Sequence, residues 1–85
     1  MTALQDQRGA LEAIERIVNR GGDPEAVLEQ SVGVLRRLYP DAAIVCERRD
    51  GAGVAAIDVG TEPPAEDREF LDRVATLVSA YCRPA

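Results

Sequence analysis

The dipeptide Asp50-Gly51 lies between two short runs of β-branched and small apolar residues, and it constrains the fold more than any other feature. Asp-Gly favours the left-handed backbone conformations that a two-residue hairpin turn requires. The flanking runs, at about 42–48 and 53–59, are each long enough for one strand. If Asp50-Gly51 is the turn, Arg49 pairs with Ala52, and every later pair follows by counting. The sequence therefore predicts one antiparallel β-hairpin.

The predicted register divides the hairpin into two faces of different composition. One face is apolar or thiol throughout and suits a core: Ala42, Ile44, Cys46, Ala55, Ile57 and Val59. The other face is mixed and carries two carboxylates: Ala43, Val45, Glu47, Val54, Ala56 and Asp58. Its apolar members would allow close contact with another surface, so they form a candidate interface: Ala43, Val45, Val54 and Ala56.

The chain before the hairpin has the pattern of two helices, at about 3–19 and 24–39. Apolar residues follow a helical stripe in each, and Gly21-Gly22 stops the first. Asp23 can cap the second helix, and Pro24 suits its first turn. Pro40 ends it. Gly33, in its middle, costs roughly 1 kcal/mol relative to Ala, which suggests close approach by another backbone.

The chain after the hairpin predicts a third helix at about 64–82. It has the cleanest amphipathic stripe: Phe70, Leu71, Val74, Leu77, Val78 and Tyr81. With 85 residues the chain suits one domain with a thin core. The expected fold is α+β in the order α-α-β-β-α, with an antiparallel hairpin packed on three helices.

Composition excludes several kinds of chemistry. The chain has no His, so a His-ligated metal or haem site and a Ser-His-Asp triad cannot form within it. Its net charge of −5 opposes binding to nucleic acid and to anionic membranes. The acidic residues Glu47, Asp58 and 66–69 are expected to be solvated surface, because no cleft would shift them toward acid/base work. We expect no enzyme activity, no catalytic or metal-binding residue and no cofactor.

The two cysteines, Cys46 and Cys82, have no metal-binding or CxxC spacing. Cys46 lies on the apolar face, so we expect a small buried hydrophobe. A redox role would need exposure and a thiolate, which the neighbouring Glu47 opposes. Cys82 is expected to be the more exposed one, and a Cys82–Cys82 bridge between chains could form in air. With no signal-peptide pattern, we expect a cytoplasmic protein with reduced thiols.

Three stretches resemble the GAF domain, a small-molecule-sensing module of signalling proteins. Residues 10–38 are similar to its opening helix pair, in which a short break leads to a D-x-E-x-x-L helix start. Residues 41–51 are similar to its first strand and a D-G turn. Residues 53–81 are similar to its last strand and closing helix, with E-D-x-x-F-L-x-x-V-A. The resemblance implies a minimal GAF-like fold.

The middle strands and helices that form most of the GAF ligand pocket have no counterpart here, so no ligand-binding residue is carried over. A two-stranded sheet is marginal by itself and has two open edges. We therefore expect a homodimer that extends the sheet or packs helices into a bundle, with a small monomer as the other possibility. The expected function is a non-catalytic signalling or interaction module in a bacterial-type cytosol, acting through homodimerisation or another signalling protein. The alternative is a small-molecule sensor whose pocket forms between protomers.

Overall fold

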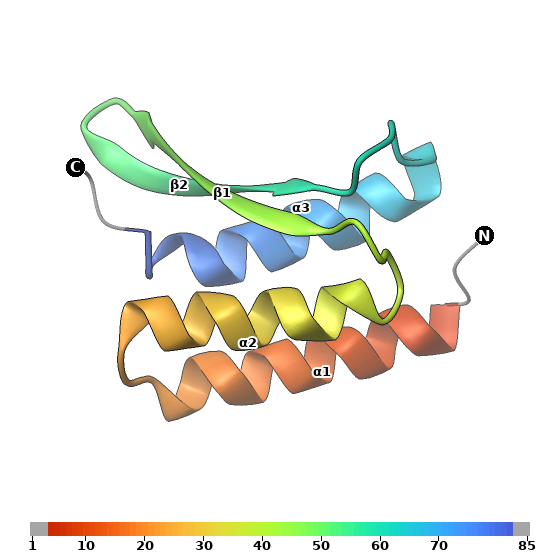
Figure 1. The fold of residues 1–85 in the computed structure, drawn as a ribbon, viewed down its shortest axis with the longest axis horizontal. Helices are drawn as coiled ribbons and strands as arrows, with labels where there is room; N and C mark the ends of the chain where they lie inside the picture. Colours follow the sequence, from red (N-terminus) through yellow and green to blue (C-terminus); the bar gives the residue numbers. More distant parts are fainter. Residues whose placement is uncertain (1–3, 83–85) are drawn as a thin grey trace.

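The computed structural model describes residues 4–82, so Ala3, expected in the first helix, and the tail 83–85 lie outside it. Within this range the order is α-α-β-β-α, which confirms the predicted α+β class (Figure 1). The elements are α1 (Leu4–Arg20), α2 (Pro24–Arg36), β1 (Ala43–Arg49), β2 (Ala52–Asp58) and α3 (Ala65–Ser79).

The hairpin has the predicted register. Arg49 pairs with Ala52, Cys46 with Ala55 and Ile44 with Ile57, in antiparallel order. Asp50 has a φ of 51° and Gly51 a φ of 81°, the two positive values of a type I′ turn. Counting from Asp50-Gly51 was therefore sufficient to assign every strand pair.

Apart from the start of α2 at Pro24, which is as predicted, the element ends differ from the predicted ones by one to three residues. Both strands are displaced by one residue toward the turn, to 43–49 and 52–58. Helix α2 ends at Arg36, three residues before the expected position, and the chain continues as a hydrogen-bonded turn to Tyr39. Pro40 disfavours a helical conformation at Tyr39, and before it the N–H groups of Arg37 and Leu38 bond three residues back instead of four. Helix α3 ends at Ser79, and residues 80–82 continue from it as a hydrogen-bonded turn.

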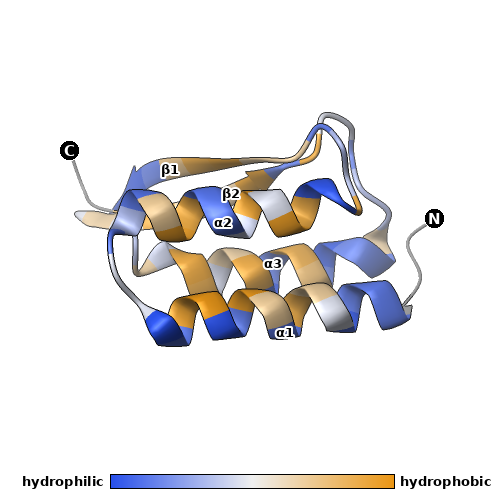
Figure 2. Cartoon of the chain, turned by 60° about the horizontal axis from the view of Figure 1, so that its bottom comes forward, coloured by the Kyte–Doolittle hydropathy of each residue, from blue (hydrophilic) through white to orange (hydrophobic). Residues whose placement is uncertain are grey.

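The hairpin forms a layer on one side of the three helices (Figure 1). Strand β2 packs mainly on α3, while α1 packs against both α2 and α3. Fully buried side chains from all three helices form the centre of the core: Ile14, Leu35, Val74 and Val78. The hairpin adds Ala42, Ala55 and Val59 from its predicted apolar face. Hydrophilic residues occupy the helix ends and connecting loops and also recur along the middle of α1 and α2 (Figure 2).

Two expectations about α2 are wrong. Asp23 precedes the helix in an extended conformation, but its side chain makes no capping hydrogen bond. Gly33 is exposed, and a Cβ added to it would have no neighbour within 4 Å. Gly33 is therefore not needed for close packing by another backbone. The first helical position of Pro24 is as predicted.

A buried carboxylate connects the helices at one end of the core. Asp67, which we expected to be solvated, is only 4% exposed. The amide of Gln7 on α1 donates to its Oδ1 at 2.9 Å, and the hydroxyl of Tyr39 donates to its Oδ2 at 2.9 Å. Both carboxylate oxygens thus have a donor from a different segment of the chain. The amphipathic pattern of α3 gave no sign of this, because the partners come from residues distant in sequence.

We expect Asp67→Ala to lower the free energy of unfolding by about 2–3 kcal/mol, because the buried Gln7 amide would lose its acceptor and the hydrogen bond from Tyr39 would be removed. Urea unfolding followed by circular dichroism measures this change. The matched control is Asp72→Ala on the exposed side of the same helix, which should change stability by less than about 0.5 kcal/mol. Equal effects of the two substitutions would contradict a structural role for the Asp67 cluster.

Candidate functional site: the outer face of the hairpin

The candidate interface residues lie on one side of the hairpin; Ala43 also borders a hollow against α2, and Val54 and Ala56 border a groove against α3. We call this side the outer face, and the strand pairs assign to it Ala43, Val45, Glu47, Arg49, Ala52, Val54, Ala56 and Asp58. No other segment of the described chain lies over it (Figure 1). Val45 is 43% exposed and is the one large hydrophobic residue of the described chain in this state. Ala43, Val54 and Ala56 are partly exposed around it.

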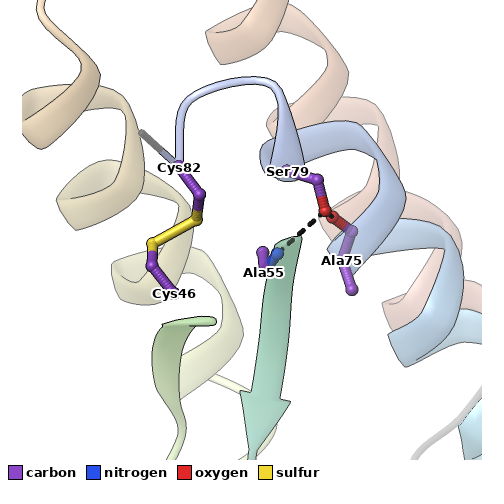
Figure 3. The surroundings of a disulfide bond; sticks show 5 residues. All are labelled: Cys46, Ala55, Ala75, Ser79 and Cys82. Atoms are coloured by element: carbon purple, nitrogen blue, oxygen red, sulfur yellow. Dashed lines mark hydrogen bonds between the residues drawn. A yellow bond between two sulfur atoms is a disulfide. The ribbon is translucent and has the colours of Figure 1, made fainter. Parts of the chain in front are cut away.

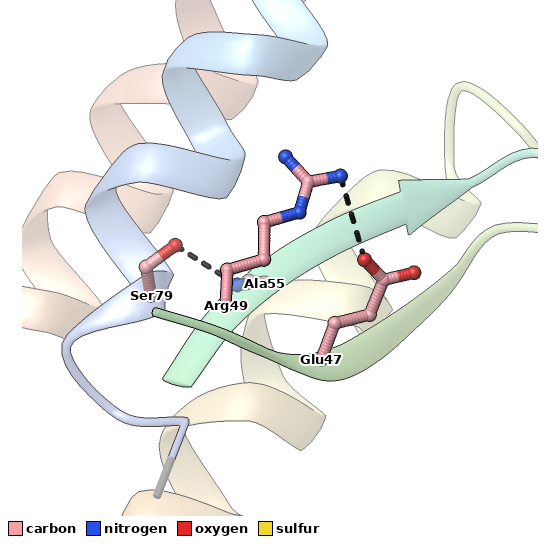
Figure 4. A network of polar contacts seen from close by, with 4 residues as sticks. All are labelled: Glu47, Arg49, Ala55 and Ser79. Atoms are coloured by element: carbon pink, nitrogen blue, oxygen red, sulfur yellow. Dashed lines mark hydrogen bonds and ion pairs between the residues drawn. The ribbon is translucent and has the colours of Figure 1, made fainter. Parts of the chain in front are cut away.

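The charges of the outer face are arranged unevenly along its length. Near the turn, Arg49 and Glu47 form an exposed ion pair with 3.6 Å between nitrogen and oxygen (Figure 4). At the opposite end, Asp58 is exposed and its Oδ1 accepts the Gly60 N–H at 2.9 Å. Glu47 faces Val54 and Asp58 faces Ala43, so the two carboxylates do not face each other across the strands. This spacing and exposure give no acid/base pair.

The free edge of β2 is partly covered by α3. The Ala55 N–H points away from β1 and donates to Ser79 Oγ at 2.9 Å (Figure 4). The Ser79 hydroxyl in turn donates to the Ala75 carbonyl one helical turn earlier (Figure 3). Ser79 therefore joins the edge of the sheet to the last turn of α3. No pattern in the sequence distinguished this serine from an ordinary helix residue.

An open groove of about 370 Å³ runs between β2 and α3 and continues onto the outer face. Its strand side includes Glu47, Arg49, Val54 and Ala56 of the outer face, and its helix side includes Leu71, Asp72, Ala75 and Thr76. The groove is thus bounded by candidate interface residues on one side and by α3 on the other.

Cys46 and Cys82 form a disulfide within the chain, with 5.5 Å between their Cα atoms (Figure 3). Three expectations are wrong. Cys46 was expected to be buried but is exposed, and Cys82 was expected to be the more exposed cysteine but is 5% exposed. Both thiols were expected to be reduced, but neither is free. Cys46 is the middle residue of β1 and pairs with Ala55, and it is exposed although its side of the strand is the apolar one. The turn at 80–82 brings Cys82 under the hairpin, into the core cluster.

Close contact at Gly53 accompanies the disulfide. A Cβ added to Gly53 would overlap the backbone carbonyl of Cys82. Gly53 pairs with Arg48, and this pair is two residues closer to the hairpin turn than the Cys46–Ala55 pair. The segment at Cys82 is therefore held against both strands, by a covalent bond to β1 and by backbone contact with β2.

Further observations bear on the kind of site. Within residues 4–82, no three side chains of His, Cys, Asp or Glu are placed to hold a metal ion. None of the described helices has the length and apolar character required to cross a bilayer. Comparison with known proteins found no matching family model, no matching curated protein and no matching solved structure.

We expect Gly53→Ala to destabilise the protein by about 1–3 kcal/mol, because the new methyl group can be accommodated only if the hairpin and the 80–82 turn separate. Thermal and urea unfolding under oxidising conditions measure the loss. Gly33→Ala is the control, because it lies in an open helix interior and should stabilise the protein by up to about 1 kcal/mol. If Gly53→Ala leaves the free energy of unfolding unchanged, the close contact does not contribute to stability.

Proposed function

We propose that this chain is a non-catalytic, GAF-like interaction module that acts in signalling through homodimerisation, with the outer face of the hairpin as the contact. The partner that binds this face is a second copy of the same chain. The observation that carries this proposal is Val45, an exposed large hydrophobic residue among small apolar neighbours on a sheet face that no described element covers. Uncovered apolar surface of this kind favours association.

The charge pattern supports a particular arrangement of the two copies. In a two-fold packing with the strands roughly antiparallel, the turn of one hairpin lies over the open end of the other. Arg49 of each copy would then approach Asp58 of the partner, twice per dimer. In the other two-fold arrangement, the two turns would lie over each other and the two Arg49 side chains would come together. Charge complementarity therefore favours the arrangement in which the turn of each hairpin lies over the open end of the other.

The size of the face predicts weak association. Two strands of seven residues are about 23 Å long and present on the order of 300 Å² to a partner. Stable complexes bury about 800 Å² per partner. We therefore expect a dissociation constant above about 10 µM, so that the module responds to its local concentration.

The GAF-like part of the proposal is supported by the element order and by the antiparallel pairing of the two strands, which in that family are neighbouring first and last strands. The missing middle elements and the absence of His from the sequence favour a module without catalysis. We place it in a bacterial-type cytosol. Disulfides in that compartment are mostly transient and redox-sensing, so the Cys46–Cys82 bond would be expected to open and close there.

Sedimentation velocity, over protein concentrations from about 10 µM to about 1 mM, tests the dimer. We expect the wild-type chain to move from monomer to dimer, and Val45→Glu to remain monomeric because it places a charge in the apolar centre of the contact. Gln30→Glu adds the same charge at an exposed position on α2 and should leave the dimer intact.

Charge reversal tests the arrangement. Arg49→Asp and Asp58→Arg should each weaken the dimer, because each places like charges opposite one another. The double variant should recover most of the lost affinity by restoring the pairs in reverse. A wild-type chain that is monomeric throughout, or that is equally affected by Val45→Glu and Gln30→Glu, would overturn the proposal.

The groove between β2 and α3 favours one alternative, a small-molecule sensor. A partner hairpin on the outer face would cover the side formed by Glu47, Arg49 and Val54 and would close the groove into a pocket between protomers. In that case a nucleotide or metabolite should raise the melting temperature of the wild-type chain but not of Val45→Glu. The absence of a shift in a folded dimer would count against the sensor.

A further inference from the structure

We infer that the Cys46–Cys82 disulfide is a thiol-responsive latch: a low-molecular-weight thiol enters at Cys46, and opening of the bond releases the hairpin from the end of α3. The exchange site itself is independent of the proposed function. Its consequence for the outer face rests on that function.

The two sulfur-bearing residues differ sharply in exposure. Cys46 is exposed on β1, whereas Cys82 is 5% exposed and packs with the core residues. An attacking thiolate must approach one of the two sulfur atoms, and access is one of the factors that decides which. Cys46 is the more exposed residue of the pair. The structure thus assigns Cys46 as the point of entry and Cys82 as the leaving and resolving thiol.

The exchange balances in two steps. A thiolate of the external thiol attacks Cys46 Sγ, forms a mixed disulfide and expels Cys82 as a thiolate, which takes up a proton. A second external thiol then attacks the mixed disulfide, and Cys46 leaves as a thiol. Two external thiols are oxidised to one external disulfide, and the protein disulfide is reduced to two thiols. Oxidation of the external pool reverses the sequence.

The disulfide is the covalent part of a small attachment between hairpin and helix. The same end of the hairpin is held by the hydrogen bond from the Ala55 N–H to Ser79 and by the backbone contact between Gly53 and Cys82. An isolated two-stranded hairpin is marginal in water. When the bond opens, Cys82 no longer holds the 80–82 turn beneath the strands. The distal half of the hairpin, residues 46–55, then depends on the remaining weak contacts.

The outer face lies on the same strands. Val45 is next to Cys46, and Val54 is next to Ala55, so their positions depend on an ordered hairpin. Loosening the strands would disperse the apolar centre of the contact between copies. The oxidised chain should therefore dimerise and the reduced chain should do so more weakly.

The entry point is tested first with glutathione as the probe. The oxidised wild-type chain is incubated with reduced glutathione, quenched with acid and mapped by peptide mass spectrometry. We expect the mixed disulfide on the peptide that contains Cys46. A mixed disulfide mainly on the Cys82 peptide, or no adduct and no reduction while the fold persists, would overturn the inference.

Hydrogen–deuterium exchange tests the release. Reduction of the wild-type chain, or the double variant Cys46→Ser/Cys82→Ser, should increase exchange of the amides at 46–55 by about tenfold or more, while amides at 14–20 in α1 keep their protection. Unchanged protection of the hairpin would overturn the latch. Loss of protection in α1 as well would also overturn it, because the bond would then hold the whole fold rather than the hairpin.

Sedimentation of the oxidised and reduced chains separates the latch from the proposed function. A dimer that weakens on reduction supports both. Release of the hairpin with entry at Cys46, in a chain that is monomeric in both states, supports the latch and overturns the dimer. A dimer of equal affinity in both states, with an unchanged hairpin, overturns the latch and leaves the dimer supported.

Discussion

The attachment of a two-stranded hairpin to the helices is the constraint on which the rest of this structure depends. Two strands cannot stabilise each other sufficiently in water, so one face has to be buried. Helix α3 supplies most of that cover, and the 79–82 segment holds the hairpin through Ser79, Cys82 and the contact at Gly53.

Hydrogen bonds from polar side chains hold the helices together in a similar way. The core is thin, and specific hydrogen bonds join segments at its margins. Asp67 accepts from Gln7 and Tyr39 at one end, while the Tyr81 hydroxyl donates to the carbonyl of Val18 in the last turn of α1 at 2.7 Å. The guanidinium of Arg36 donates to the carbonyl of Ala42, just before β1, at 3.0 Å. Tyrosine and other long side chains thus combine apolar burial with a fixed hydrogen bond.

These attachments also explain why the proposed interaction and the proposed latch concern the same part of the chain. The inner face of the hairpin is held by α3 and the disulfide, and the outer face is uncovered. A change in the inner attachment alters the strands that display Val45. In the proposed module, the state of Cys46 and Cys82 would therefore act on the outer face through the strands.

The sequence by itself determined the elements that depend on local residues: the three helices, the type I′ turn at Asp50-Gly51 and, by counting from it, every pair of the hairpin. It also placed the candidate interface on one face, because side chains alternate along a strand. Only the tertiary structure decided that Asp67 is buried, that Cys46 is exposed and that Cys46 meets Cys82. The physical reason is that burial and bonding of these residues depend on where distant segments end in space, above all the 80–82 turn beneath the hairpin, and no local pattern specifies that position.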